Sequence, residues 1–184
     1  MHWLESIDMI SMIRLKDKSI GPCHPLSSWD VSGMFLQTPK FNSSKIEDLR
    51  MLTALSKELG WMVNIENMLS RTYDAIVLTD EHQIINWVNN GFEPMTGYSP
   101  EYAIGKSPKF LQGKETYRID LDRIKKKIKS SMPFSDRVTN YKKNGNLYSC
   151  EISIIPLMNA ESDISHYIAL EKELVWKNNK TYKH

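Results

Sequence analysis

The sequence predicts an α+β domain in which a five-stranded antiparallel sheet carries short helices on one face, with a helical extension before it. Two short apolar runs, at 75–79 and 84–88, have the composition of strands and are separated by a short turn. Helical segments follow, and three more strand-like runs close the pattern. Asn144-Gly145 joins the first two of these runs and is a strong hairpin signal. Strands joined by such short turns pair antiparallel, which predicts one continuous sheet.

The composition favours one ordinary domain with attached segments. The chain has 184 residues, and its 24 Lys and Arg against 22 Asp and Glu give a net charge of +2. A charge this small gives no argument for nucleic acid or anionic lipid. Two cysteines, Cys23 and Cys150, exclude a disulfide-stapled scaffold, and no Cys or His pair has zinc-ligand spacing. No apolar run could span a bilayer and no secretory pattern opens the chain, so we expect a cytoplasmic protein without a membrane partner.

Residues 1–43 form an irregular or helical N-terminal extension in this interpretation. Apolar residues between 7 and 15 could form a helix, which Gly21-Pro22 would end. The pattern assigns no function to this segment.

A single amphipathic helix is predicted over 44–70. Ser44 can cap its first turn and Glu47 can reach back to the cap, which is a capping box. Two interpretations stay open: the helix packs on the open face of its own sheet, or it pairs with its twin in a homodimer. Both rest on one apolar stripe of Ile46, Leu49, Leu52, Leu55, Leu59, Met62, Ile65 and Leu69.

The sheet and its helices occupy 71–172, and 173–184 is a C-terminal tail or short helix. Because such a sheet has one covered face, a hollow between sheet and helices is a natural ligand pocket. Short helical segments are predicted at 91–95 and 100–104. A longer helix is predicted over 114–130, with Ile119, Leu121, Ile124 and Ile128 facing inward. The closing strands are predicted at 134–142, 146–157 and 165–170.

A series of short motifs in this region is similar to a known family. In order they are Asn89-Asn90-Gly91-Phe92, Met95-Thr96-Gly97-Tyr98, Glu101 to Lys106, Phe110-Leu111-Gln112-Gly113, Glu115-Thr116, Asn140 to Gly145 and Ile152 to Pro156. Each motif alone is weak, but their order and spacing together are specific. The region resembles a PAS domain, and within that family it most resembles the LOV class of flavin-based blue-light sensors.

The resemblance implies a site that has lost its photochemical thiol. LOV domains place a cysteine just before the Phe-Leu-Gln-Gly run, and its sulfur adds to the excited flavin. The matching position in this chain is Pro108, which has no thiol. The resemblance therefore implies a domain in which the covalent photocycle of the family does not run.

The remaining flavin contacts are partly kept. Gln112 and Asn140 match the family's glutamine and first strand asparagine, whereas Cys150, Ser107 and Glu171 replace a second asparagine, a third asparagine and the sensing glutamine of the last strand. Lys109 and Lys125 replace two phosphate-binding arginines, which keeps the charge and loses the bidentate fork. These changes argue against tight FMN binding, because unpaired polar groups penalise a ligand that cannot satisfy them.

The sequence also bears on ligands other than flavin. Heme is not expected, since the 114–132 segment, where heme-binding PAS domains carry their axial ligand, has no histidine, and His82 and His166 are expected on the surface. A small apolar ligand and a filled core without any ligand both remain open. Either would use the same inward-facing residues, namely Val77, Trp87, Phe92, Phe110, Ile124, Ile152 and Ile154.

Enzymatic and nucleic-acid functions find no support in the motifs. Apolar residues fall at every fourth position between 123 and 129. The lysines between them therefore form the solvent-exposed face of an amphipathic helix. No carboxylate pair, phosphate loop or nucleophile elbow occurs. We therefore expect a stand-alone, non-enzymatic PAS module that acts by ligand sensing or by protein–protein contact through the 44–69 helix or the sheet face. A flavin-binding sensor without the covalent adduct is the alternative.

Overall fold

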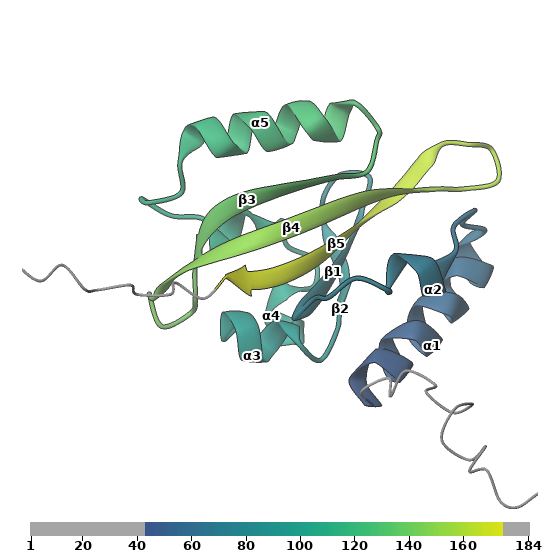
Figure 1. Cartoon of the computed structure of the whole chain (residues 1–184), viewed down its shortest axis with the longest axis horizontal. Coiled ribbons are helices and arrows are strands. Elements are labelled where there is room, and N and C mark those ends of the chain that lie inside the picture. The colour runs from purple at the N-terminus through teal and green to yellow at the C-terminus, as the bar shows by residue number, and fades with distance from the viewer. Residues whose placement is uncertain (1–42, 175–184) are drawn as a thin grey trace, which may run out of the picture. The chain divides into compact units, whose positions relative to one another are not determined.

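The computed structural model describes residues 43–174, so the predictions for residues 1–42, including Cys23, and for 175–184 lie outside the described residues. Within this range the chain forms five strands and several short helices (Figure 1). The elements in order are α1 (Ser43–Leu59), α2 (Ile65–Met68), β1 (Ala75–Asp80), β2 (Ile85–Val88), α3 (Phe92–Thr96), α4 (Pro100–Ala103), the 3-10 helix η3 (Pro108–Leu111), α5 (Arg118–Lys129), β3 (Phe134–Tyr141), β4 (Leu147–Met158) and β5 (Ile164–Leu174).

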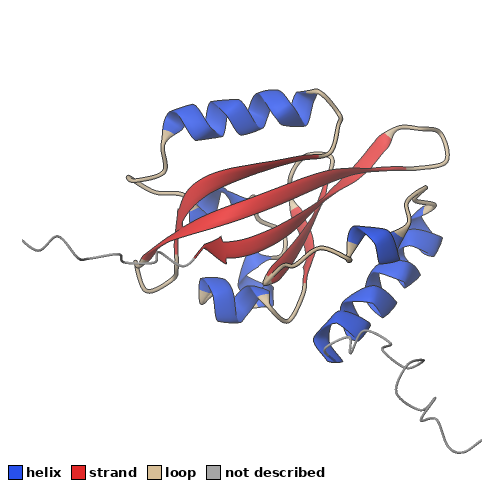
Figure 2. Ribbon diagram, in the orientation of Figure 1, coloured by secondary structure: helices blue, strands red, loops and turns tan. Residues whose placement is uncertain are grey.

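The predicted antiparallel sheet is confirmed. Its strand order is β2-β1-β5-β4-β3, and every neighbouring pair is antiparallel (Figure 2). The first hairpin, β1–β2, and the final meander, β3–β4–β5, therefore meet where β1 pairs with β5. Gly145 makes the turn between β3 and β4 at a φ of 85°, a value that glycine adopts without steric cost.

Each face of the sheet carries its own hydrophobic core. The α3, α4 and α5 helices pack on one face, where Phe92 and Ile124 meet Val77 and Ile152 from the strands. The α1 and α2 helices pack on the other face through Leu52 and a second set of residues. Because strand side chains alternate between faces, β1 contributes to both cores and is almost wholly buried.

Of the two interpretations of the N-terminal helix, the structure shows packing on the open sheet face, but the single helix predicted over 44–70 is wrong in length. The α1 helix ends at Leu59, where Gly60 takes a φ of 66° and reverses the chain. A new helix, α2, starts after Asn64, whose side chain accepts the backbone N–H of Asn67 at 2.8 Å. Met62, which the single helix placed on the apolar stripe, is 77% exposed.

Four smaller expectations are also wrong. Ile119 does not face inward on α5 but is 73% exposed. Trp87 packs with α1 and α2 on the second face, away from the expected pocket. The last strand runs to Leu174, so residues 173 and 174 belong to the sheet and not to a tail. His166 is half-buried and not on the surface, since its ring packs against Trp61 at a centroid distance of 5.2 Å.

Candidate functional site

A cavity of about 310 Å³ lies between the sheet and the segment from η3 to α5. This volume is at the small end of the range typical of ligand pockets. Much of its wall is apolar, and the apolar lining from β1, β3, β4, η3 and α5 includes Val77, Leu111, Ile124, Val138, Ile152 and Ile154. The hollow predicted from the sheet pattern is therefore present on the expected face.

The polar residues predicted for the site are brought together by the fold. Six of the seven line this cavity, namely Ser107, Lys109, Gln112, Lys125, Asn140 and Glu171, and the exception is Cys150. Asn140 and Glu171 are buried, whereas Lys109 and Lys125 are exposed. The cavity thus has a buried polar end and a cationic mouth.

Cys150 does not line the cavity, although it belongs to the same core and lies two residues from the wall residue Ile152 on β4. Its Sγ is 3.9 Å from Oε2 of Glu171 and 3.7 Å from the backbone oxygen of Glu151, so the thiol has two weak acceptors. Burial, followed by the charge of Glu171, raises the pKa of the Cys150 thiol well above its usual range. An uncharged, enclosed thiol is a poor nucleophile, which fits a structural position better than a reactive one.

Glu171 is the most unusual group of the site. Its side chain lines the cavity and the residue is only 6% exposed. Burial raises the pKa of this carboxyl to about 7, while the Cys150 thiol acts weakly in the opposite direction. The residue is fixed by the sheet, since it pairs with Ala75 on β1 and with Ile152 on β4. The cavity therefore holds a carboxyl that changes its charge near neutral pH.

Within residues 43–174, no cation pairs with Glu171. Lys142 pairs with Glu173 at 2.9 Å. The carboxylate of Asp74 accepts the backbone N–H of Glu173 at 2.8 Å. It therefore adds a further negative charge close to this end of β5. The hydroxyl of Tyr148 is buried without a hydrogen-bond partner among the described residues, and burial raises its pKa. A negative charge on Glu171 would therefore meet little compensation from the protein.

The wall of the cavity includes the position that the resemblance to LOV domains matches to a reactive cysteine. Ser107 and Pro108 both line the cavity at the start of η3, and Pro108 occupies the first turn of that helix. In the described part of the chain the sole cysteine is Cys150, which is buried and does not line the cavity. The described residues thus place no thiol at the mouth.

Sequence reasoning missed three polar wall residues, Thr79, Gln83 and Tyr167. Thr79 and Tyr167 are register partners on β1 and β5. Each lies two residues from a wall residue of its own strand, Val77 or Ala169, so strand alternation places them on the same face. That period-two signal was available in the sequence once the strands were assigned.

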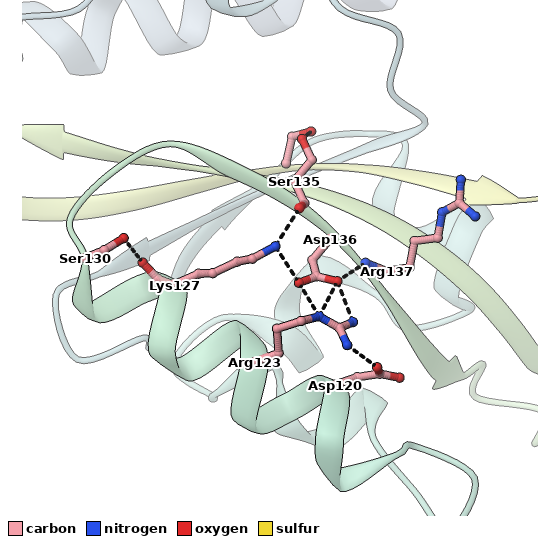
Figure 3. A network of polar contacts seen from close by, with 8 residues as sticks. Asp120, Arg123, Lys127, Ser130, Ser135, Asp136 and Arg137 are labelled. Atoms are coloured by element: carbon pink, nitrogen blue, oxygen red, sulfur yellow. Dashed lines mark hydrogen bonds and ion pairs between the residues drawn. The ribbon is translucent and has the colours of Figure 1, made fainter.

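An ion-pair network fixes α5 against β3 and so holds one wall of the cavity in place (Figure 3). Asp136 of β3 receives Arg123 Nη2 at 2.6 Å and Lys127 Nζ at 2.9 Å, and Arg123 Nη1 also reaches Asp120 at 2.9 Å. Hydrogen bonds from Arg123 hold the pKa of Asp136 well below its usual range. Arg123 and Lys127 thus hold α5 against β3.

A second polar cluster joins α1 to the sheet on the opposite face. The carboxylate of Asp48, which is buried, accepts the Tyr73 hydroxyl at 3.1 Å and Nδ2 of Asn89 at 3.0 Å. Oδ1 of Asn89 in turn accepts the backbone N–H groups of Ile76 at 2.8 Å and Gly91 at 3.2 Å. One side chain of α1 is therefore linked to both β1 and the start of α3.

Replacing Asp48 with alanine is expected to lower the free energy of unfolding by about 1–3 kcal/mol, because Tyr73 and Asn89 then keep buried donors without an acceptor. Equilibrium urea unfolding measures the change. The matched control is Glu47→Ala on the exposed side of the same helix turn, where the pair with Arg50 is worth less than about 1 kcal/mol. Equal effects of the two substitutions would contradict a structural role for the Asp48 cluster.

Comparisons with known proteins agree with this architecture. A family model described as PAS domain matches residues 74–174. The chain is 32% identical over 108 residues to a blue-light photoreceptor of Listeria innocua, which covers 57% of this chain and 42% of that protein. It is 27% identical over 107 residues to a nitrogen fixation regulatory protein of Klebsiella pneumoniae, covering 58% of this chain and 22% of that protein. The chain thus spans less than half the length of these relatives.

Solved structures share the fold. The light-state structure of the blue-light photoreceptor Aureochrome1 LOV matches with a TM-score of 0.55 and 24% identity, over 62% of this chain and 90% of that one. The LOV domain of a blue-light activated histidine kinase from Erythrobacter litoralis matches with a TM-score of 0.52 and 24% identity, over 56% of this chain and 98% of that one. At this identity the likeness concerns the fold alone.

Two further features of residues 43–174 concern membranes and metals. None of the helices in that range combines the length and the apolar composition that a transmembrane helix needs. The same residues contain no group of three or more His, Cys, Asp and Glu side chains placed to hold a metal ion.

Proposed function

The chain belongs to the PAS domain family, and from this premise we propose that it is a sensory module of signal transduction that binds a small molecule in the cavity beside α5. The observation that carries the proposal is Glu171. A buried carboxyl without a strong partner, facing a cavity whose wall is largely apolar, costs free energy that a filled core would not require. A ligand that hydrogen bonds with this group recovers that free energy.

Ligand binding proceeds without a thiol adduct in this proposal. Pro108 stands where the LOV class has its reactive cysteine, and Cys150 is buried and does not line the cavity. The domain performs no catalysis of its own; it converts occupancy of the cavity into a change at its surface.

The second candidate is a flavin sensor that works without the covalent bond. Two observations favour it: Gln112 and Asn140 line the cavity, as the resemblance to LOV domains implies, and a relative carries the name blue-light photoreceptor. Lys109 and Lys125 at the mouth supply charge for the phosphate of FMN. Glu171 counts against this candidate, because it stands where the LOV class has the glutamine of its last strand.

The visible spectrum of freshly purified protein separates the two candidates. A ligand other than flavin predicts colourless protein from which denaturation releases a small molecule, identified by mass spectrometry. A flavin predicts yellow protein whose blue absorption persists under blue light, because residues 43–174 place no thiol at the mouth. Colourless protein that releases nothing would contradict both candidates.

We propose that the output is a protein–protein contact, with a protein partner or a second copy of this chain. The α1 helix supports this proposal because Asp48 links it to β1, which also forms part of the cavity wall. Much of the α1 apolar stripe is used against the chain's own sheet, but Ile46, Met51 and Leu59 remain exposed. Light scattering after size exclusion tests the homodimer: wild type should be dimeric and Ile46→Glu/Met51→Glu monomeric, and a monomeric wild type would contradict it.

A further inference from the structure

The positive charge of the chain is concentrated on α5. This helix of 12 residues contains six basic and two acidic side chains, which gives it a net charge of +4. Subtracting this +4 from the +2 of the whole chain leaves −2 for all other residues. A helix of one sign on a chain whose remaining charge has the other sign indicates electrostatic recognition of an acidic group.

Only two of the six cations hold the helix in place. Arg123 and Lys127 point toward β3, where both bind the carboxylate of Asp136 (Figure 3). The other four are exposed, and they are Arg118, Lys125, Lys126 and Lys129. Most of the charge of α5 is therefore not needed to pack it on the sheet.

The four exposed cations form one stripe along the helix. Lys125 and Lys126 lie two turns beyond Arg118, and Lys129 follows one turn later. Asp122 lies within the stripe and meets Arg118 at 3.9 Å and Lys125 at 4.0 Å. No ion pair among residues 43–174 involves Lys126 or Lys129. These two ammonium groups are thus available to carboxylates of another molecule.

An apolar side chain borders this stripe. Ile119 is 73% exposed, whereas Leu121, Ile124 and Ile128 of the same helix line the cavity. Ile119 precedes Lys126 by seven residues, which is close to two full turns, so the two share one side of the helix. Apolar contact next to charged groups is the composition of a protein interface with its polar rim.

The side of α5 that faces away from the sheet is open. Among the described elements, no helix or strand lies on that side (Figure 1). We infer that this outer face of α5 binds an acidic segment of a protein partner, with carboxylates at Lys126 and Lys129 and an apolar side chain against Ile119. The inference rests on the proposed output through a protein–protein contact, and it adds the chemical class of the partner.

A protein partner fits this face better than a nucleic acid does. Affinity for nucleic acid depends on many simultaneous phosphate contacts, whereas one helix carries the positive charge and the other residues together are negative. The face is also tied to the cavity, because α5 forms one wall of it. A ligand that shifts this wall shifts the binding surface of the partner with it.

The probe is a fluorescein-labelled helical peptide with glutamates on one side and leucines on the other. A second peptide carries glutamine in place of every glutamate. Fluorescence anisotropy with the full-length protein at low salt gives both dissociation constants. We expect Lys126→Gln/Lys129→Gln to bind the glutamate peptide about fivefold more weakly than wild type does and the glutamine peptide equally well. Ile119→Ser should weaken both peptides, since the apolar contact does not depend on charge.

The matched control is Lys57→Gln/Lys143→Gln, because these lysines are exposed and lie on α1 and in the turn between β3 and β4. We expect it to bind both peptides as wild type does, and circular dichroism verifies that each variant is folded. Equal losses in the control, or equal wild-type affinity for the two peptides, would overturn the inference. Tighter binding of single-stranded DNA through Lys126 and Lys129 would overturn the class of partner. Peptide affinity that falls as protein concentration rises would mean that a second copy of the chain covers this face instead.

Failure here is distinguishable from failure of the proposed function. Protein that carries a small molecule and does not bind the glutamate peptide would reject the α5 surface and leave ligand sensing intact. Protein that carries no small molecule and still binds the peptide through Lys126 and Lys129 would reject ligand sensing and keep the surface.

Discussion

Gly91→Ala is expected to lower the free energy of unfolding by roughly 4 kcal/mol or more, a size seen for overlaps that side-chain adjustment cannot relieve. A methyl group at Gly91 would overlap the backbone carbonyl of Asp74. Asp74 cannot easily move away, because its N–H donates to the Glu171 carbonyl at 2.8 Å and its carboxylate accepts the Glu173 N–H at 2.8 Å. The substitution therefore disturbs the start of β1 and the strand that carries Glu171.

Urea unfolding followed by circular dichroism measures this effect. Asn90→Ala is the matched control, because Asn90 is the adjacent residue and is exposed. We expect the control to stay within about 0.5 kcal/mol of wild type. A Gly91→Ala protein as stable as the control would show that the contact between the two segments is not as close as described.

Glu171→Gln is expected to remove a loss of stability that wild type suffers as pH rises. The pKa of Glu171 is about 7 in the folded protein and near its ordinary value of 4.5 in the unfolded chain. Between pH 4.5 and pH 7, Glu171 is protonated in the folded protein but ionised in the unfolded chain. The free energy of unfolding is therefore highest below about pH 4.5 and falls as pH rises to about 7. The total loss is about 3 kcal/mol, and glutamine, which never ionises, avoids it.

The measurement is the unfolding free energy of ligand-free wild type and Glu171→Gln near pH 5 and near pH 8. We expect the variant to gain on wild type by up to about 3 kcal/mol at the higher pH. Asp136 does not interfere, because its lowered pKa affects stability only in more acidic solution. Parallel pH profiles of the two proteins would mean that Glu171 finds a compensating partner when it ionises.

The sheet was predictable because its signals are local. Turn residues such as Asn144-Gly145 and the apolar strand runs lie next to one another in the sequence, and every strand follows within a few residues of its prediction. The break at Gly60 was missed because one glycine within a long apolar stripe costs a helix only about 1 kcal/mol. Packing of Trp61 and Ile65 on the sheet favours the bend instead.

Trp87 was placed on the wrong face for a different reason. The register of β1 and β2 shifts between Leu78 and Thr79, so the side chains of β2 do not alternate regularly between the two faces of the sheet. Trp87 pairs with Leu78 and shares its face. A bulge of this kind depends on how two strands meet, which a single strand's pattern does not contain.

The sequence predicted which residues line the cavity, but not the raised pKa of Glu171. The resemblance to LOV domains selected six polar residues that do line one cavity, and it also selected Cys150, which is buried nearby but does not line it. The raised pKa of Glu171 depends on burial and on the lack of a nearby cation, and both are tertiary properties. Sequence reasoning could only note that a buried carboxylate there would be costly.

The central claim is that the cavity holds a small molecule without a covalent bond, and native mass spectrometry of freshly purified protein tests it most directly. Wild type should show an added mass that disappears on denaturation. Ala169→Phe, which fills the cavity from β5, should be folded and show the bare protein mass. Wild type at its bare mass, or an added mass that survives denaturation, would contradict the account.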